Sequence, residues 1–449
     1  MYSTIARNLV YPAADRLLGT KVMTYLKELE ESQWWSPEQL RELQDRKLRA
    51  LVQYAYDKVP YYRRIFQERG LTAESIQTVK DLQMLPILTK DIIRDQISDL
   101  IAEDANGRKA FLNSTGGTTG QPLKYWIDMD VTSISWAGMF RGWGWARYRL
   151  GDKRSTLAGS SLVPDEKPPL PKRLRWILER DKPFSAVHMN KERMAAYVKH
   201  MTSYNPVFLR GYATSLYTFA IYLQETGVNT IRPRAIFSTA EMLLPRYREI
   251  IESQFGCRVY DQYGCYDGGL QAMECCSHSG YHISVEKVIM EFVGEDQNAV
   301  VAGCPGAILA TDLHNYSMPF IRYAVGDRGT LSNEACACGR GLPLMRSLEG
   351  RTTDILRFSN GTTLSGPALT VIFGDCPVKQ YQVIQTTGDN LLVKVIRDTN
   401  YTEEATIRFM RIIKAHVGEE VTVQTEFVSH IPTTKGGKHR FIVSLLSDS

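Results

Sequence analysis

Apolar side chains follow a helical period in the first hundred residues of the chain and a mixed pattern after that. The helical period is clearest after Ser36-Pro37-Glu38-Gln39, which has the form of a capping box with proline at the first helical position. The apolar positions that continue this helix are Leu40, Leu43, Leu48, Leu51, Val52 and Ala55, and Pro60 ends it. The pattern predicts a mainly helical segment over residues 1–105.

Between about residue 111 and residue 350, short runs of apolar and β-branched residues alternate with helical periods. Ala235-Ile236-Phe237 and the stretch from Ile283 to Val293 are examples of the strand-like runs. Alternation of this kind predicts strands connected by helices, and therefore an α/β sheet. We expect this sheet and the helical segment to form one large domain over residues 1–350.

The last hundred residues have a pattern of their own. Two strand-like runs, 381–387 and 391–396, are joined across Thr387-Gly388-Asp389-Asn390. A helix follows, capped by Thr402 and ended by Gly418, with one apolar face made by Ile407, Met410, Ile413 and Val417. Residues 421–428 then alternate as a strand does. This order predicts a small α+β domain over residues 351–449, and the whole chain is expected to be an α/β multidomain protein.

Composition excludes several classes of protein. The 449 residues include 54 basic and 49 acidic side chains, and these are interleaved without a basic stripe, which argues against nucleic-acid binding. No uninterrupted apolar run has the length that a bilayer crossing requires, and the N-terminus lacks the apolar core of a signal peptide. The eight cysteines are few for a disulfide-bonded secreted protein of this length. We therefore expect a cytoplasmic protein with reduced thiols and no membrane span.

A loop rich in glycine and hydroxyl side chains stands out near residue 115. Its sequence is Ser114-Thr115-Gly116-Gly117-Thr118-Thr119-Gly120-Gln121-Pro122. Glycines let backbone N–H groups converge on an anion, and the hydroxyl groups add further donors. The loop is not a Walker A motif, because no Gly-Lys-Ser/Thr follows the glycines. It predicts a phosphate-binding loop, with a flexible surface loop as the alternative.

This loop resembles the phosphate-binding motif of the acyl-adenylate-forming superfamily, although Gln121 stands where that family usually carries lysine. The resemblance implies that this loop holds the phosphates of ATP. The residues concerned are Ser114, Thr115, Gly116, Gly117, Thr118, Thr119 and Gly120. Further segments follow in the family's order. Ser238-Thr239-Ala240-Glu241 resembles the segment beside the adenine and acyl pockets, which implies nucleotide contacts from Ser238, Ala240 and Glu241.

The segment Tyr260–Asp267 resembles the family's Tyr-Gly-x-x-Glu motif. The resemblance implies that an aromatic ring packs on adenine and that Asp267, at the glutamate position, holds Mg²⁺ and takes part in catalysis. The nucleotide contacts implied are Asp261, Gln262, Tyr263 and Gly264. Arg322–Gly329 resembles the Tyr-x-x-Gly-Asp segment, in which the carboxylate of Asp327 would accept hydrogen bonds from both ribose hydroxyls.

Two later segments resemble the mobile part of the family. Gly350-Arg351-Thr352-Thr353-Asp354 resembles the hinge before a lid domain, so Arg351 would contact the nucleotide and Thr353 stands at the pivot. The family often has Asp or Lys at that pivot. Pro432-Thr433-Thr434-Lys435-Gly436-Gly437-Lys438 is similar to the family's tail motif, which puts Lys438 in the catalytic position and leaves Lys435 as the alternative. The small domain would then be a mobile lid.

The helical N-terminus and the segment Arg210–Ser215 are similar to one branch of the superfamily, the phenylacetate–CoA ligase and CapK-like group. In that branch the segment lies at the entrance of the acyl pocket. The resemblance therefore implies that Tyr212, together with Gly264, lines the pocket for the acid. A buried aromatic ring of the core is the alternative for Tyr212.

Two short cysteine clusters predict a metal site. Cys275-x-x-His278 and Cys336-x-Cys338 each let two side chains reach one ion, and together they complete the four ligands of a closed, structural zinc site. Similar segments in the CapK-like branch support this interpretation. Free thiols, or a site in which Cys276 or His282 replaces one ligand, are the alternatives.

The resemblance implies an AMP-forming carboxylate ligase that uses ATP and Mg²⁺. A small carboxylic acid would become an acyl-adenylate, and coenzyme A would then accept the acyl group as a thioester. An amine acceptor, giving an amide, stays open, as does a non-catalytic protein that keeps the fold. The expected partners are the acid and a thiol or amine, without nucleic acid, and a homodimer is open as an alternative to a monomer.

Overall fold

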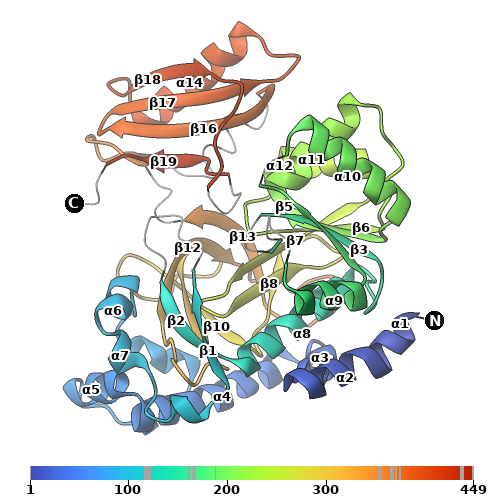
Figure 1. Ribbon diagram of the computed structural model, residues 1–449. Helices are drawn as coiled ribbons and strands as arrows, with labels where there is room; N and C mark the ends of the chain where they lie inside the picture. The colour runs from blue at the N-terminus through green and yellow to red at the C-terminus, as the bar shows by residue number, and fades with distance from the viewer. Residues whose placement is uncertain are drawn as a thin grey trace.

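The computed structural model describes residues 2–115, 123–159, 162–163, 168–187, 189–351, 356–364, 369, 372–373, 376–434 and 439–446, without the side chains of Pro171 and Arg351. It has a large part built on one long sheet and a small C-terminal part built on another sheet (Figure 1). The α/β multidomain fold predicted from the sequence is confirmed, and the small C-terminal domain is present.

Helices make up most of the chain before residue 110. They are α1 (Tyr2–Ile5), α2 (Tyr11–Leu18), α3 (Val22–Ser32), α4 (Pro37–Lys58), α5 (Pro60–Glu68), α6 (Lys90–Asp95) and α7 (Ile97–Leu100), with one π and three 3₁₀ segments between them. The predicted capping box is present, since the N–H of Gln39 donates to Oγ of Ser36 and the N–H of Ser36 donates to Oε1 of Gln39. The apolar face of α4 is buried against the antiparallel half of the large sheet.

The large sheet has eleven strands in the order β10-β11-β12-β13-β9-β8-β7-β6-β5-β3-β4. Strands β4, β3, β5, β6 and β7 pair in parallel, and the others pair antiparallel. The parallel strands are β3 (Arg154–Ala158), β4 (Asp181–Ser185), β5 (Phe208–Tyr212), β6 (Ala235–Thr239) and β7 (Arg258–Cys265). The others are β8 (Leu270–Glu274), β9 (Tyr281–Ile283), β10 (Val288–Val293), β11 (Pro305–Asp312), β12 (Tyr323–Leu331) and β13 (Leu344–Arg351).

Five helices connect or cover these strands: α8 (Met129–Trp145), α9 (Leu170–Glu179), α10 (Lys191–Tyr204), α11 (Ala213–Glu225) and α12 (Pro245–Phe255). Helix α8 crosses the sheet at very short range. A Cβ on Gly138 would lie 1.9 Å from Oε1 of Gln271, and one on Gly142 would lie 2.0 Å from Sδ of Met273. Glycine at these two positions is therefore what lets the helix pack directly on β8.

A separate hairpin, β1 (Ala110–Ser114) with β2 (Lys124–Asp128), stands beside the antiparallel half of the sheet (Figure 1). Asp128 fixes its lower end, because the carboxylate accepts hydrogen bonds from the backbone of Tyr316 (2.7 Å) and Ser317 (3.0 Å). At the other end of the hairpin Ser114 pairs with Lys124, and the predicted phosphate loop connects the two strands there.

The small domain has a four-stranded sheet in the order β18-β17-β16-β19, and helix α14 (Glu403–Val417) lies between β17 and β18 in the chain. Its strands are β16 (Val378–Thr387), β17 (Asn390–Arg397), β18 (Thr422–Phe427) and β19 (Ile442–Ser444), and a short pair, β14 (Leu356–Arg357) with β15 (Thr363–Leu364), precedes them. The β-β-α-β order predicted from the pattern is confirmed.

The small domain shares a hydrophobic cluster with α11 and α12 of the large part. Tyr247 on α12 is central to this contact, since its ring stacks on Tyr217 (centroids 4.0 Å apart) and lies 6.3 Å from that of Phe441. Among the described residues, no helix is both long and apolar enough to cross a membrane.

Candidate functional site

The carboxyl ends of β6 and β7 bring together several residues that the motifs predicted. Asp261, only 4% exposed, accepts hydrogen bonds from Oγ of Ser238 and from the hydroxyl of Tyr281 (2.7 Å). Its backbone N–H donates to Glu274 (2.9 Å). Ligands of open α/β sheets bind at this edge, outside the carboxyl ends of the strands. Tyr281 and Glu274 had no sequence signal of their own.

Burial raises the pKa of Asp261 to about 6, and the nearby Glu274 carboxylate adds to this effect. The hydrogen bonds from Ser238 and Tyr281 act in the opposite direction and are too weak to offset it. Asp261 is therefore a buried acid whose charge changes close to neutral pH.

Tyr263 and Asp327 lie next to each other although 64 positions separate them in the sequence. The hydroxyl of Tyr263 donates to Oδ2 of Asp327 at 2.8 Å. Asp327 is on β12, directly opposite Arg351 of β13, and Tyr263 is on β7. The ring that is predicted to pack on adenine and the carboxylate that is predicted to bind the ribose are therefore held together by a hydrogen bond.

Asp267 lies just beyond β7, and both of its carboxylate oxygens accept hydrogen bonds. Tyr323 donates to Oδ2 and the thiol of Cys265 donates to Oδ1, both at 2.7 Å. Each carboxylate oxygen accepts one of these bonds and has a lone pair left for a cation. A Cβ on the neighbouring Gly268 would meet Val325 at 2.8 Å, which explains why this turn is glycine.

The base of the phosphate loop is closed across the β1–β2 hairpin. The N–H of Thr115 donates to the carbonyl of Leu123, and the N–H of Leu123 donates to Oγ1 of Thr115, both at 2.9 Å. Tyr125 of β2 connects this base to the rest of the site. Its hydroxyl accepts from Asn113 (3.1 Å), and burial together with the nearby Asp267 raises its pKa.

Glu241, at the end of β6, forms hydrogen bonds with two segments that are distant from it in the sequence. Its Oε2 accepts hydrogen bonds from the N–H (2.9 Å) and the hydroxyl of Thr214, at the start of α11, and its Oε1 accepts from the N–H of His439 (2.8 Å). Ala240, just before it, has φ of +70°, a strained value for a residue with a Cβ. Sequence reasoning missed Thr214 and His439, although both lie within one or two positions of predicted site residues.

Several predicted residues lie outside the described part of the chain: Gly116, Gly117, Thr118, Thr119, Gly120, Gln121, Thr353, Lys435 and Lys438. Arg351 is described by its backbone alone, at the end of β13. Gly350, which precedes it, has φ of +90°, a conformation that favours glycine. Of the remaining predictions, Gln262 is buried on β7, and Gly264 is exposed two positions after it.

Tyr212, predicted to line the acyl pocket, is fully buried at the end of β5 and packs against Ala158 and Val163. Two residues earlier on the same strand lies Arg210, which is 8% exposed. Arg210 begins the segment that resembles the acyl-pocket entrance, but the sequence did not indicate that its side chain is buried inside a strand of the parallel sheet.

The structure brings together Cys275, His282, Cys336 and Cys338, whose ligand atoms all lie within 4.8 Å of one another. This corrects the predicted fourth ligand from His278 to His282, which was the alternative. His278 lies on the turn after β8 with φ of +49°, and its ring faces Glu274 and Tyr260. His282 is on β9, where Nδ1 faces the carbonyl of Leu342 (3.2 Å) and Nε2 lies 3.3 Å from Sγ of Cys338.

The chemistry of this cluster suits a metal. Burial holds the pKa of His282 down, to about 4, so the imidazole is neutral, as a ligand must be. Cys275 and Cys336 have their sulfur atoms 3.6 Å apart. Burial opposes ionisation of Cys336, but hydrogen bonds from Ser279 and from Cys338 outweigh it and lower its pKa to about 7.

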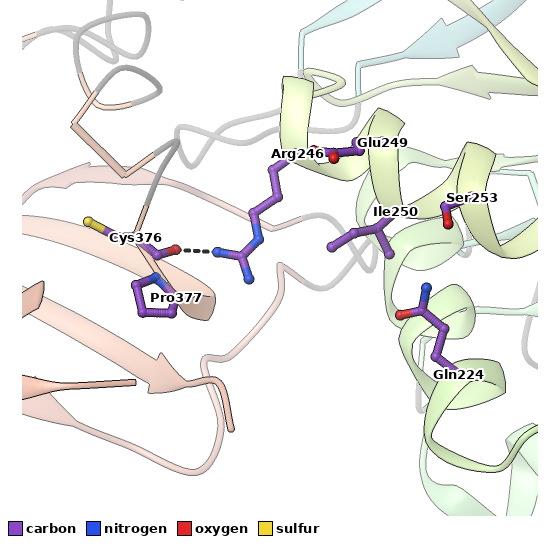
Figure 2. A pocket seen from close by; sticks show the side chains of 7 residues that line it. All are labelled: Gln224, Arg246, Glu249, Ile250, Ser253, Cys376 and Pro377. Atoms are coloured by element: carbon purple, nitrogen blue, oxygen red, sulfur yellow. Dashed lines mark hydrogen bonds between the residues drawn. The ribbon is translucent and has the colours of Figure 1, made fainter. Parts of the chain in front are cut away.

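A cleft of about 430 Å³ lies between the large part and the small domain (Figure 2). It is lined by Gln224, Arg246, Glu249, Ile250, Ser253, Cys376 and Pro377. Arg246 reaches across it, donating to the carbonyl of Cys376 and pairing with Asp398 at 2.8 Å. None of the predicted site residues lines this cleft, so it is a feature of the junction between the two parts.

The chain is similar to known proteins over most of its length. Residues 356–445 match the family model of the CapK C-terminal domain. The chain is 26% identical to protein CapK of Staphylococcus aureus, over 90% of this chain and 89% of that protein. It is 24% identical to the phenylacetate-coenzyme A ligase of Thermus thermophilus, over 94% of this chain and 100% of that enzyme.

Among solved structures, the fold is similar to that of 2-hydroxyisobutyryl-CoA ligase in complex with R3-HIB-AMP. The TM-score is 0.75 at 19% identity, and the match covers 92% of this chain and 91% of the ligase. The relatives and structural neighbours are thus CapK and AMP-forming CoA ligases. The chain is similar to CapK and to phenylacetate-coenzyme A ligases over most of its length, in agreement with the branch of the acyl-adenylate-forming superfamily that its motifs resemble.

Proposed function

We propose that the protein activates a small carboxylic acid as its acyl-adenylate, using ATP, and then transfers the acyl group to coenzyme A. In the first step the acid's carboxylate attacks the α-phosphorus of ATP, a new acyl O–P bond forms and pyrophosphate leaves. In the second step the thiol attacks the acyl carbon, gives up its proton and releases AMP. Such steps need positioned charge more than covalent help from the protein.

One observation carries the proposal: Tyr263 donates to Asp327 at 2.8 Å, at the sheet edge where Ser238 and Asp261 also meet. An aromatic ring and a carboxylate held in one unit suit a nucleoside, with adenine against the ring and the ribose hydroxyls donating to the carboxylate. Arg351, opposite Asp327 in the sheet, is the cation we assign to the nucleotide.

We assign the catalytic cation to Lys438. The backbone N–H of the next residue, His439, donates to Glu241 at the end of β6. The chain at His439 therefore lies beside the proposed acyl and adenine pockets. Lys438 is the residue directly before His439 in the chain. A lysine there would neutralise charge that develops on the phosphate oxygens. Thr353 would be the pivot of the hinge between domains 1–350 and 351–449.

Two metals belong to the proposal. Asp267 would hold Mg²⁺, which neutralises phosphate charge when bound. Cys275, His282, Cys336 and Cys338 would hold a structural zinc ion, since a closed set of four ligands leaves no position for a substrate. Tyr281 lies on β9 just before His282 and donates to Asp261, so this zinc would steady one wall of the nucleotide site.

An amine acceptor, giving an amide, is the second candidate. Residues 356–445, the part that would face the acceptor in the second step, match the CapK C-terminal domain. Release of AMP on adding coenzyme A supports the thioester. Release that occurs with amines and not with coenzyme A would replace it by the amide.

Pyrophosphate exchange with a panel of aromatic, aliphatic, hydroxy and amino acids tests the first step and identifies the acid. We expect ATP-dependent exchange with one class of acid, and Asp327→Ala should weaken ATP binding by at least tenfold, as the loss of a charged hydrogen-bonding group does. Protein that binds ATP but catalyses no exchange with any acid would overturn the enzyme proposal in favour of a nucleotide-binding protein.

A further inference from the structure

Arg210 occupies an unusual place for a charged side chain. It is the middle residue of β5, and since side chains alternate along a strand it shares a face of the sheet with Phe208 and Tyr212. That face lies under α8, where Phe208 packs with Trp143 and Phe237. Tyr212, two residues further on, is the residue assigned to the acyl pocket.

The guanidinium group of Arg210 has no acidic partner among the described residues. Its Nε is buried without a hydrogen bond, and its Nη2 has the sulfur of Met139 as a neighbour at 4.0 Å. Burial lowers its pKa to about 10, and the positive charge of Arg154 adds to this. A buried charge without a partner costs several kcal/mol, so a protein that keeps one has a use for it.

The nearby carboxylates are already engaged by another arginine. Arg154 on β3 pairs with Asp181 at 2.8 Å and with Glu179 at 3.2 Å. Asp181 also accepts from the hydroxyl of Thr156. Among the described residues, the same region therefore holds one arginine with two carboxylate partners and another with no carboxylate partner. Arg210 is thus the arginine that could bind an anion from outside the protein.

A second unsatisfied donor lies beside Arg210. Nε1 of Trp143 is buried without a hydrogen bond, and the guanidinium carbon of Arg210 lies 5.4 Å from the centre of the Trp143 ring. Two unpaired N–H donors next to each other suit an acceptor with two oxygen atoms, such as a carboxylate. Met139, which contacts Arg210, and Trp136, one turn earlier on α8, are both partly exposed, so this region lies at the edge of the core.

We propose that Arg210, with Trp143, binds a second carboxylate at the far end of the acid substrate, so that the protein adenylates a dicarboxylic acid. This inference rests on the proposed function, because it identifies the class of acid that the same site would take. Arg210 would be the specificity residue for the remote carboxylate, while the other carboxylate would face the α-phosphorus of ATP.

The test is pyrophosphate exchange with short dicarboxylic acids, such as succinate, glutarate and adipate, against their monomethyl esters. Wild type should favour one diacid over its ester, mainly through KM. Arg210→Met should lose roughly 10- to 100-fold in kcat/KM for the diacid and little for the ester, as expected for loss of a charged hydrogen bond. Arg210→Lys should restore part of the preference, and Arg234→Met, an arginine that lies over the ring of Phe208 from outside, is the matched control.

Thermal unfolding separates this role from a structural one. Removing a buried charge that has no partner should leave the Tm of Arg210→Met equal to or above that of wild type. A Tm loss as large as that of Arg154→Met, which breaks two ion pairs, would show that Arg210 serves the core and would overturn the inference.

Two kinetic results would also overturn it, and they differ in what they leave standing. Wild-type exchange that is as fast with the monomethyl esters as with the diacids, together with an unchanged kcat/KM of Arg210→Met for the diacids, would remove the dicarboxylate and keep the adenylation. No exchange with any acid, by protein that still binds ATP, would remove the proposed function and this inference with it.

Discussion

The nucleotide-site residues and the cysteine–histidine cluster compare differently with the residues named from the sequence. In the first group the structure holds two hydrogen-bonded pairs of named residues, Ser238 with Asp261 and Tyr263 with Asp327. In the second, the three cysteines lie with His282, which was the alternative, and not with His278. Motifs at strand ends are placed by the sheet, whereas a turn such as 275–280 depends on dihedral angles that spacing does not reveal.

The largest effect should come from the cluster. His282→Ala should abolish metal binding, while His278→Ala, its matched control, should keep it, because Nε2 of His282 faces Cys338 and the ring of His278 faces Glu274. Metal analysis of purified protein should find about one zinc per chain in wild type and in His278→Ala. Zinc retained by His282→Ala and lost from His278→Ala would restore the original ligand set.

Lys438→Ala should lower the rate of pyrophosphate exchange by roughly 10²–10³, because it removes a charge that stabilises the transition state. ATP should still bind, as a separate equilibrium measurement would show. Lys435→Ala is the control, and the two lysines would exchange roles if that variant, rather than Lys438→Ala, lost the activity.

Asp261 sharpens the comparison, since it connects the nucleotide site to β9. Its pKa is about 6 in the folded protein against 3.8 for the ordinary carboxyl, so the folded state holds this proton more tightly than the unfolded state. The resulting stability is complete below about pH 4 and is lost as the pH rises through about 6, by up to about 3 kcal/mol. Denaturant unfolding should be measured for wild type and Asp261→Asn at pH 4.5 and 7.5. The free energy of unfolding of the variant, relative to that of wild type, should be higher at pH 7.5 than at pH 4.5. A difference that does not change with pH would exclude this titration.

Tyr263→Phe should have the smallest effect. The ring that would pack on adenine stays, and the hydroxyl that holds Asp327 is lost, so the Kd for ATP should rise by about 2- to 10-fold. Asp327→Ala should weaken binding more, and Tyr263→Phe in that background should add little, because the two side chains act together. Additive effects of the two changes would separate their roles.

The sequence predicted the α/β architecture, the helical N-terminus and the β-β-α-β order of the small domain, because each depends on local periodicity. The contact of Glu241 with Thr214 and His439 depends on tertiary packing across 198 positions, and no local pattern could indicate it. The burial of the Arg210 side chain was missed for a related reason. A charge inside an apolar run is recognised as unusual only once its neighbours are known to lack a carboxylate.

The cleft at the junction of the two parts gives the small domain two kinds of attachment. Arg246–Asp398 and Lys379–Glu225 are ion pairs with partly exposed side chains, whereas Tyr247 and Phe441 form an apolar contact. Dissolved salt screens charges over about 8 Å at physiological ionic strength and leaves apolar contacts intact. The two ion pairs at this junction should therefore weaken as ionic strength rises, and the aromatic contact should then carry a larger share of the attachment.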